Sequence, residues 1–555
     1  MGDLTLIHIG DLHGHLVPRP HLREDGTGGT EGGLARVATL VDRVRASRRR
    51  SLLVNTGDTI QGSAEALFTR GQALVDVVDR LRVDVFAPGN WDYLYGKDRF
   101  LELFGPGTGS PGATGPAERH RWGAVACNVY HAATSDLLLP PTGVVDAGGL
   151  RVGVVGLSSE RAINALGPWV TEGIDFTGDA HEVAGHVDRL REQGVDLVVL
   201  VSEFGLAKNV LIAESVPGID VVLSSDMHEE TSQVVRTSTG ALVSEVGQDG
   251  TRVGVLDLSV GPDGVTGWDY ALHTVSEELP DDPEVAALVE RVRAPFVAGP
   301  AFRPHRNPLN GAVLRRPIDD VVGRTRIPLH RSGFARGPAP AVVSGTSHDM
   351  IAAALREQTG ADVGHLRGFR YGTHVAPGPV RLEDLYHYLP VGAQVGAGRV
   401  SGAQLRRLIE NSAAGALDPD PWAWKGGWLH SLAGVSYDLD PGATGGSYAS
   451  AVTVRRAGES EAGDLPLDPE ATYTVAGYFY DRAAGKVGPL PAQGEAVDLL
   501  RLDDGGVLDA TEVVARHLAE HEVTGAPDRV RLVAPLAAAA YGNPEIQPLS
   551  PEGSA

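Results

Sequence analysis

The sequence contains a single cysteine, Cys127, among 555 residues. One thiol excludes an intrachain disulfide and a metal site built from several cysteines. The cysteine stands in the apolar run Ala-Val-Ala-Cys-Asn-Val. This setting predicts a buried strand and an inert thiol rather than a reactive one.

Basic residues are scarce relative to acidic ones. Lys and Arg number 48 against 71 Asp and Glu, which gives a formal net charge of −23. Duplex nucleic acid and anionic membranes both bind basic surfaces, so we expect neither as a partner. A small anionic substrate stays compatible with this charge, because a bound metal ion can outweigh the global field locally. The oligomeric state is left open.

Long apolar runs are also missing, since none approaches the ~20 residues of a membrane helix. The chain passes from Met1 directly into a strand-like segment, Leu4–Gly10, without the basic region, apolar core and cleavage site of a signal peptide. We therefore expect a cytoplasmic protein by default, or an exported one if the sequence is that of a mature form.

What the sequence does have is a regular alternation of short apolar strands and amphipathic helices over residues 4–275. This alternation predicts an α/β architecture, and a chain of this length exceeds one ordinary core. We predict two domains, with an α+β second domain and a disordered Pro/Ser/Gly-rich tail. The expected boundaries are 1–275 for the first domain, 276–339 for a linker helix and connection, 340–535 for the second domain and 544–555 for the tail.

Five short polar segments follow predicted strands and carry the candidate site. Each alone is a commonplace turn sequence, but their conjunction is not. Ligands of open α/β sheets collect at the carboxyl ends of the strands, and carboxylates with imidazoles at one sheet edge suit a pair of divalent cations. The segments are Gly10–Gly14, Asn55–Asp58, Gly89–Asp92, Ser202–Gly205 and Ser225–His228.

The order of these segments resembles that of the calcineurin-like metallophosphoesterases. The chain behind them resembles the C-terminal domain of the 5′-nucleotidase branch, in segments 368–372, 382–390, 400–410 and 434–441. The resemblance implies an αββα sandwich followed by an α+β substrate-binding domain. It also implies a metal-dependent phosphoric monoester hydrolase of the 5′-nucleotidase type, active in nucleotide catabolism.

Carried over to this chain, the resemblance implies two divalent cations held by seven side chains. The first cation would be held by Asp11, His13, Asp58 and His228, and the second by Asp58, which bridges both, with Asn90, Glu203 and Asp226. The family usually has histidine at the places of Glu203 and Asp226. Because carboxylates suit hard cations, we expect an altered metal centre that favours Mn²⁺, with Zn²⁺ or Fe²⁺ as alternatives at the first site.

The same resemblance assigns roles to the side chains around the metals. A metal-bridging hydroxide would attack the phosphorus while Arg370 stabilises the charge that develops on its oxygens. Phosphatases of this kind have a histidine where Trp91 stands, and tryptophan cannot transfer a proton. The candidate catalytic residues are Asp58, Asn90, Asp92 and Arg370, and the candidate substrate-binding residues are Trp91, Phe369, Arg370 and Tyr371. For the aromatic residues and Arg370, core packing and an interdomain ion pair are the alternatives.

Several features leave the substrate open. Trp91 and the segments Arg70–Gln72 and Asp418–Gly427 are similar to the thiosulfohydrolases of bacterial sulfur oxidation. The second base-binding aromatic segment of 5′-nucleotidases is missing after Ala476–Asp481. Three hypotheses therefore stand: a hydrolase of nucleotides or similar phosphoesters, a thiosulfohydrolase-like enzyme for a carrier-bound sulfonate, and a non-catalytic anion- or metal-binding protein.

Overall fold

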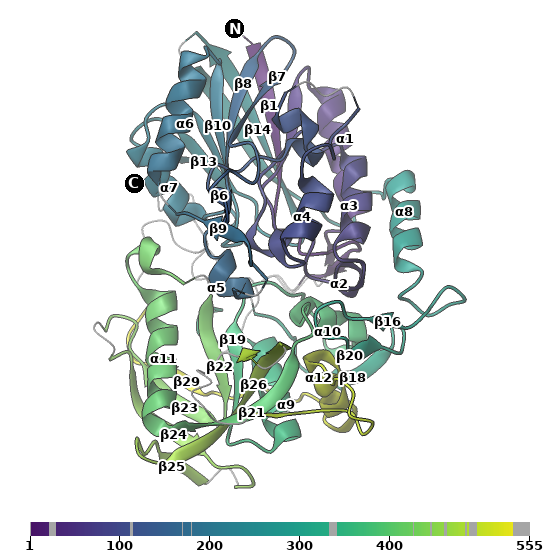
Figure 1. Cartoon of the computed structure of the whole chain (residues 1–555), viewed down its shortest axis with the longest axis vertical. Helices are drawn as coiled ribbons and strands as arrows, with labels where there is room; N and C mark the ends of the chain where they lie inside the picture. Colours follow the sequence, from purple (N-terminus) through teal and green to yellow (C-terminus); the bar gives the residue numbers. More distant parts are fainter. Residues whose placement is uncertain are drawn as a thin grey trace.

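The structure is a computed structural model that describes residues 2–21, 29–111, 115–168, 170–178, 180–262, 264–331, 341–425, 427–443, 447–459, 463–482, 485–487 and 497–536. Figure 1 shows two domains, with the N-terminal one in purple to blue above the C-terminal one in green to yellow. The predicted tail, 544–555, lies outside the described residues.

Two sheets face each other in the N-terminal domain. The first has the strand order β15-β14-β1-β4-β5 and the second the order β12-β13-β11-β10-β8-β7. The strands of the first sheet are β1 (Gly2–Ile9), β4 (Ser51–Asn55), β5 (Val85–Phe86), β14 (Arg252–Gly261) and β15 (Gly264–Thr274). Those of the second are β7 (Thr142–Asp146), β8 (Arg151–Leu157), β10 (Leu197–Ser202), β11 (Val221–Ser224), β12 (Val235–Arg236) and β13 (Leu242–Glu245).

Helices cover the outer faces of both sheets, because alternate residues of each strand point to opposite sides. Leu52 and Val54 of β4 join the core between the sheets, while Leu53 joins the core beneath the helices. The first sheet is covered by α1 (Leu34–Ser47) and α3 (Gln72–Val78), and the second by α6 (Ala180–Glu192) and α7 (Leu206–Ser215). This arrangement confirms the predicted αββα sandwich.

Parallel pairing brings the candidate segments to one edge of the sandwich. In the first sheet β1 pairs in parallel with β4, and β4 with β5. In the second, β10 pairs in parallel with β8 and β11. The carboxyl ends of these strands therefore meet on the side of the domain that faces the second domain (Figure 1).

The connection begins with α8 (Pro283–Arg293), capped by the side chain of Asp282. The short strands β16 (His305–Arg306), β17 (Val313–Leu314) and β18 (Val321–Thr325) follow. β18 pairs with β20 (Gly378–Arg381) of the second domain, so this domain takes up chain that the sequence had assigned to the linker. The pairing partner lies more than 50 residues further on, beyond the reach of local sequence patterns.

The C-terminal domain has an α+β organisation, as predicted. Its main sheet has the order β22-β19-β26-β21-β28, and a second sheet the order β25-β24-β23-β29. The strands are β19 (Val363–Gly368), β21 (Gln394–Ser401), β22 (Trp428–Ala433), β23 (Val435–Leu439), β24 (Ala449–Arg455), β25 (Asp464–Pro466), β26 (Thr472–Arg482), β28 (Asp498–Leu499) and β29 (Val530–Leu532). The principal helices are α9 (Thr346–Thr359), α10 (Leu382–Tyr388), α11 (Gly402–Leu417) and α12 (Ala510–Glu520). Throughout the described part of the chain, every helix is too short or too polar to cross a membrane.

Direct contacts join the two domains beside the candidate site. Arg293 of α8 bonds both Glu65 of α2 (Ala64–Thr69) and Glu383 of α10. The rings of His15 and His387 stack with centroids 4.1 Å apart. These contacts hold the second domain over the carboxyl ends of the first domain's strands.

Candidate metal centre

The loops after β1, β4 and β11 hold their polar residues in an unusual backbone conformation. Asp11, His13, Asp58, Asp226 and His228 all have positive φ angles, between 40° and 91°. Non-glycine residues rarely adopt this region, and each instance costs ~1–3 kcal/mol that the surrounding fold must offset. Such clustering of backbone strain is typical of a functional site.

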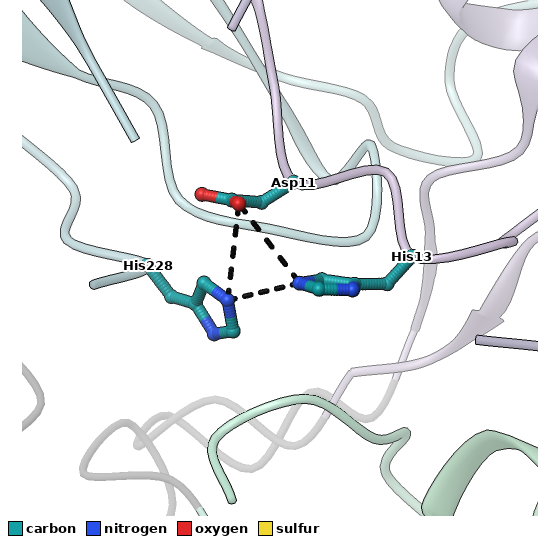
Figure 2. A group of neighbouring side chains, drawn as sticks. All are labelled: Asp11, His13 and His228. Carbon is teal, nitrogen blue, oxygen red and sulfur yellow. Dashed lines mark hydrogen bonds and ion pairs between the residues drawn. The ribbon is translucent and has the colours of Figure 1, made fainter. Parts of the chain in front are cut away.

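A first group of ligands consists of Asp11, His13 and His228 (Figure 2). The Nε2 atoms of the two histidines lie 3.0 Å apart, and each is 3.9 Å from Oδ1 of Asp11. The Nδ1 of His13 donates to the side-chain oxygen of Gln61 at 3.0 Å. This bond fixes the tautomer and leaves a lone pair on Nε2, which is the arrangement that a metal-binding imidazole needs.

A second group consists of Asp11, Asp58 and Glu203, whose ligand atoms lie within 4.8 Å of one another. Asp58 accepts a hydrogen bond from the backbone of Trp91 at 2.7 Å, and Glu203 accepts one from the backbone of Asn90 at 3.0 Å. Asp11 Oδ1, Glu203 Oε1 and Asn90 Oδ1 are buried without a hydrogen-bond partner among the described residues. Each of these three side chains therefore keeps one oxygen for a further ligand, and this donor set fits divalent cations.

The electrostatics of the two groups also favour cations. Burial, followed by repulsion from neighbouring acids, raises the pKa values of Asp11, Asp58 and Glu203 well above their ordinary range. Burial lowers the pKa of His13 to about 4 and that of His228 well below its ordinary value. Neutral imidazoles beside mutually repelling carboxylates form a site that binding of a positive ion stabilises.

Asp226 lies beside the second group but points elsewhere. Its carboxylate bonds the guanidinium of Arg161 and lies 3.6 Å from that of Arg370. Arg370 also donates to the backbone carbonyl of Asp226 and contacts the sulfur of Met227. The expected role of Asp226 as a metal ligand stays a prediction.

Asp92 occupies a supporting position. Its Oδ1 accepts hydrogen bonds from the backbone of Thr59 and Ile60, at 2.9 and 3.2 Å, and its Oδ2 accepts one from Gly89 at 2.9 Å. Burial raises its pKa to about 6, against the opposing effect of these bonds. Asp92 thus holds the loop that carries Asp58, and its expected part in the chemistry stays a prediction.

A cavity of about 640 Å³ opens between the domains next to the ligand groups. It is lined by Asp58, Asn90, Asp226 and His228 from the first domain and by side chains of β19, α11 and the loops around them from the second. The sequence-predicted substrate residues Trp91, Phe369, Arg370 and Tyr371 all line it. The structure therefore brings the metal and substrate candidates to one place.

The aromatic candidates pack against one another in the cavity wall. Phe369 and Tyr371 stack with ring centroids 4.6 Å apart and an interplanar angle of 9°. Trp91 meets Tyr371 edge to face at 5.2 Å, and His348 covers Phe369 at 4.1 Å. A base that entered between Phe369 and Tyr371 would first have to separate this pair.

Sequence reasoning missed Arg161 and Gln61. Gln61 sets the tautomer of His13, as described above. Arg161 follows β8 in the segment Ser158–Arg161, at the start of α5 (Ala162–Leu166). It could have been found by applying the strand-end argument to this sixth segment, since Arg161 also lines the cavity.

Comparison with known proteins agrees with this architecture. The family model for the calcineurin-like phosphoesterases matches residues 4–230, and that for the 5′-nucleotidase C-terminal domain matches residues 321–495. The probable 5′-nucleotidase of Treponema pallidum is 24% identical over 92% of this chain and 91% of that protein. Endonuclease YhcR of Bacillus subtilis is 22% identical over 85% of this chain, which corresponds to only 36% of the endonuclease.

Solved structures share the fold of the whole chain. The 5′-nucleotidase precursor from Thermus thermophilus has a TM-score of 0.75 at 22% identity, covering 96% of this chain and 99% of that one. The sulfate thiohydrolase SoxB of the same species has a TM-score of 0.77 at 21% identity, covering 97% and 98%. Both families expected from the sequence are thus found among the structural neighbours. The chain thus combines an N-terminal region that matches the calcineurin-like phosphoesterases with a C-terminal region that matches the 5′-nucleotidase C-terminal domain.

Proposed function

We propose that this protein is a dinuclear metal-dependent hydrolase of small phosphoesters, nucleotides among them. One observation carries the proposal: the candidate metal ligands Asp58, Asn90 and His228 line the same cavity as cationic side chains from both domains. Arg161, Arg367, Arg370 and Lys425 are the lysine and arginine residues of this lining in the described part of the chain. Despite the overall negative charge, this cavity suits an anionic substrate.

The ligand groups divide naturally between two cations. The first cation would be held by Asp11, His13, His228 and Asp58. The second cation would be held by Asp58, Asn90 and Glu203. Asp226, the remaining candidate, contacts two arginines instead. Two bound divalent cations supply a nucleophile from water at neutral pH and offset charge on the reacting group. The oxygen-rich second set favours Mn²⁺ over Zn²⁺.

The chain's own residues would bind and orient the substrate. Arg370 brings a buried guanidinium from the second domain to the edge of the metal centre, where it can stabilise charge on phosphate oxygens. Trp91 lines the cavity beside Asn90 and cannot donate a catalytic proton. We therefore expect this protein to hydrolyse best those phosphoesters whose leaving groups need no protonation.

Trp91 also favours a second candidate, the thiosulfohydrolase-like hydrolysis of a carrier-bound sulfonate. A sulfonate has the same tetrahedral shape as a phosphoryl group and also carries its charge on oxygens, so Arg370 could hold either. The cavity of about 640 Å³ offers room for a carrier side chain as well as for a nucleotide.

A substrate panel on the Mn²⁺-loaded protein tests these alternatives. The panel contains nucleoside mono-, di- and cyclic phosphates, sugar phosphates and a cysteine-S-thiosulfonate, with chelated protein as the control. Metal-dependent release of phosphate, or opening of the cyclic phosphate to a monophosphate, supports the first proposal, and sulfate release from the thiosulfonate alone supports the second. Two bound metals without turnover of any substrate would refute both and favour a binding protein.

A further inference from the structure

The guanidinium of Arg161 is buried at the edge of the metal centre, with 5% of the residue exposed. One of its nitrogens, Nη1, contacts the carboxylate of Asp226 and lies 3.2 Å from the sulfur of Met227. Its Nε and Nη2 have no hydrogen-bond partner among the described residues. A buried donor without an acceptor destabilises the fold by ~1–3 kcal/mol, so a ligand that accepts hydrogen bonds from these two nitrogens would be stabilised there.

Arg161 stays charged in this position. Burial alone lowers its pKa, but the nearby carboxylates of Asp226, Glu160, Glu203 and Glu229 outweigh that effect and raise the pKa. Arg161 lines the cavity, so an anion bound there would lie beside a guanidinium that still has two buried nitrogens without a partner among the described residues. A fixed guanidinium fork with free N–H groups matches the oxygens of a phosphoryl or sulfonyl group.

Asp226 connects Arg161 with Arg370. Its carboxylate contacts both guanidinium groups, one from each domain. The ligand atoms that cluster for the two cations come from Asp11, His13, His228, Asp58 and Glu203, and Asp226 belongs to neither cluster. A carboxylate engaged by two cations has little negative charge left to offer a metal ion.

We propose that Asp226 is an anchor for arginine rather than a metal ligand, and that Arg161 and Arg370 together bind the oxyanion of the substrate. The inference rests on the proposed function for the class of substrate, a small phosphoester. It assigns Arg161 as an anion-binding residue and Asp226 as a positioning residue. Asp226 holds the two guanidinium groups, which would otherwise repel each other, side by side at the cavity.

Three variants that each remove one charge test the assignment: Arg161→Gln, Asp226→Asn and, as a matched control, Glu203→Gln. Each protein is loaded with Mn²⁺, its metal content is measured by elemental analysis, and its affinity for inorganic phosphate is measured by calorimetry. We expect Arg161→Gln and Asp226→Asn to retain the wild-type metal content and to bind phosphate ~10–100-fold more weakly, as for loss of a charged hydrogen bond. Glu203→Gln should lose metal.

Two results would overturn the inference. Metal loss in Asp226→Asn equal to that in Glu203→Gln would make Asp226 a ligand, and unchanged phosphate affinity in Arg161→Gln would remove Arg161 from anion binding. If Arg161→Gln unfolds because it leaves Asp226 with Arg370 as its one remaining cationic partner, the double variant Arg161→Gln/Asp226→Asn removes both charges and must still bind metal normally and phosphate weakly. A wild-type protein that binds phosphate through Arg161 but hydrolyses no phosphoester would refute the proposed function and leave this inference intact.

Discussion

Replacing Glu203 by glutamine should raise the stability of the metal-free protein and at the same time weaken its binding of metal. The side chain is fully buried, and its ligand oxygen lies within 4.8 Å of those of Asp11 and Asp58. Two unit charges at that distance repel by about 3 kcal/mol at an effective dielectric constant of ~20. Glutamine keeps the acceptor for the backbone N–H of Asn90 and removes one of the repelling charges.

The effect of Glu203→Gln on the stability of the protein depends on pH and on bound metal. The pKa of Glu203 is raised in the folded protein, so the metal-free wild type loses stability as pH rises above the ordinary glutamate value. Protonation of the wild-type carboxylate relieves the repulsion, so we expect the gain of the variant over the wild type, on the order of 1–3 kcal/mol, to be larger at pH 8 than at pH 5. With ~2–4 °C per kcal/mol, its Tm at pH 8 should rise by roughly 2–12 °C.

Thermal unfolding in chelator at pH 5 and pH 8, repeated with Mn²⁺, measures both effects. Mn²⁺ should raise the Tm of the wild type more than that of Glu203→Gln, because only tight binding to the folded state adds stability. A variant less stable than the wild type in chelator at pH 8 would show that Glu203 is not repelled by its neighbours. An equal gain from Mn²⁺ in both proteins would show that Glu203 does not bind metal.

Four further outcomes are expected. Asp58→Asn should lower affinity for both metals by more than ~100-fold and abolish turnover, as measured by elemental analysis and phosphate release; retention of two metals would refute the bridging role. Because Trp91 supplies no acid, p-nitrophenyl phosphate should be cleaved ~10²–10⁴-fold faster than an alkyl phosphate, and Trp91→His should narrow the gap; equal wild-type rates would point to another acid. A Cβ on Gly89 would lie under 3.0 Å from the carboxylates of Asp58 and Glu203, so Gly89→Ala should reduce metal content, whereas Gly525→Ala, with open space around it, should not. Burial raises the pKa of Asp509 to about 7, so Asp509→Asn, which keeps the cap of α12, should stabilise the protein by up to ~4 kcal/mol at pH 8 and have little effect near pH 4; the same gain at both pH values would contradict this pKa.

The sequence predicted the elements of the first domain because their signals are local. Strands such as β4 and β10 appear as short apolar runs, and helices such as α1 and α6 as periodic ones, so both periods are readable in a short window. The candidate segments followed from their position at strand ends, and the assignment of ligands within them followed from the family resemblance. What local patterns could not give were contacts between distant segments.

Two contacts between distant segments, and one stacking arrangement within a segment, define the site in ways that the sequence did not predict. Asp226 turns toward Arg161, 65 residues earlier in the chain, and toward Arg370, 144 residues later. Phe369 and Tyr371 stack on each other, an outcome that their spacing of two residues does not dictate. In each case the sequence supplied the right residue types, and tertiary packing decided which partner each side chain took.

The same tertiary contacts explain how the strained ligand loops keep their shape. The backbone N–H groups of Asp11 and His13 donate to the carbonyls of Gly57 and Asp58, at 3.0 and 2.9 Å. The N–H of Asp226 in turn donates to Oδ2 of Asp11 at 3.1 Å. The loops after β1, β4 and β11 thus satisfy one another's polar groups, and the hydrogen bonds offset the cost of their positive φ angles. Because these bonds involve only protein atoms, the ligand atoms are brought together by the fold itself, and a cation entering the centre pays little of the cost of arranging them.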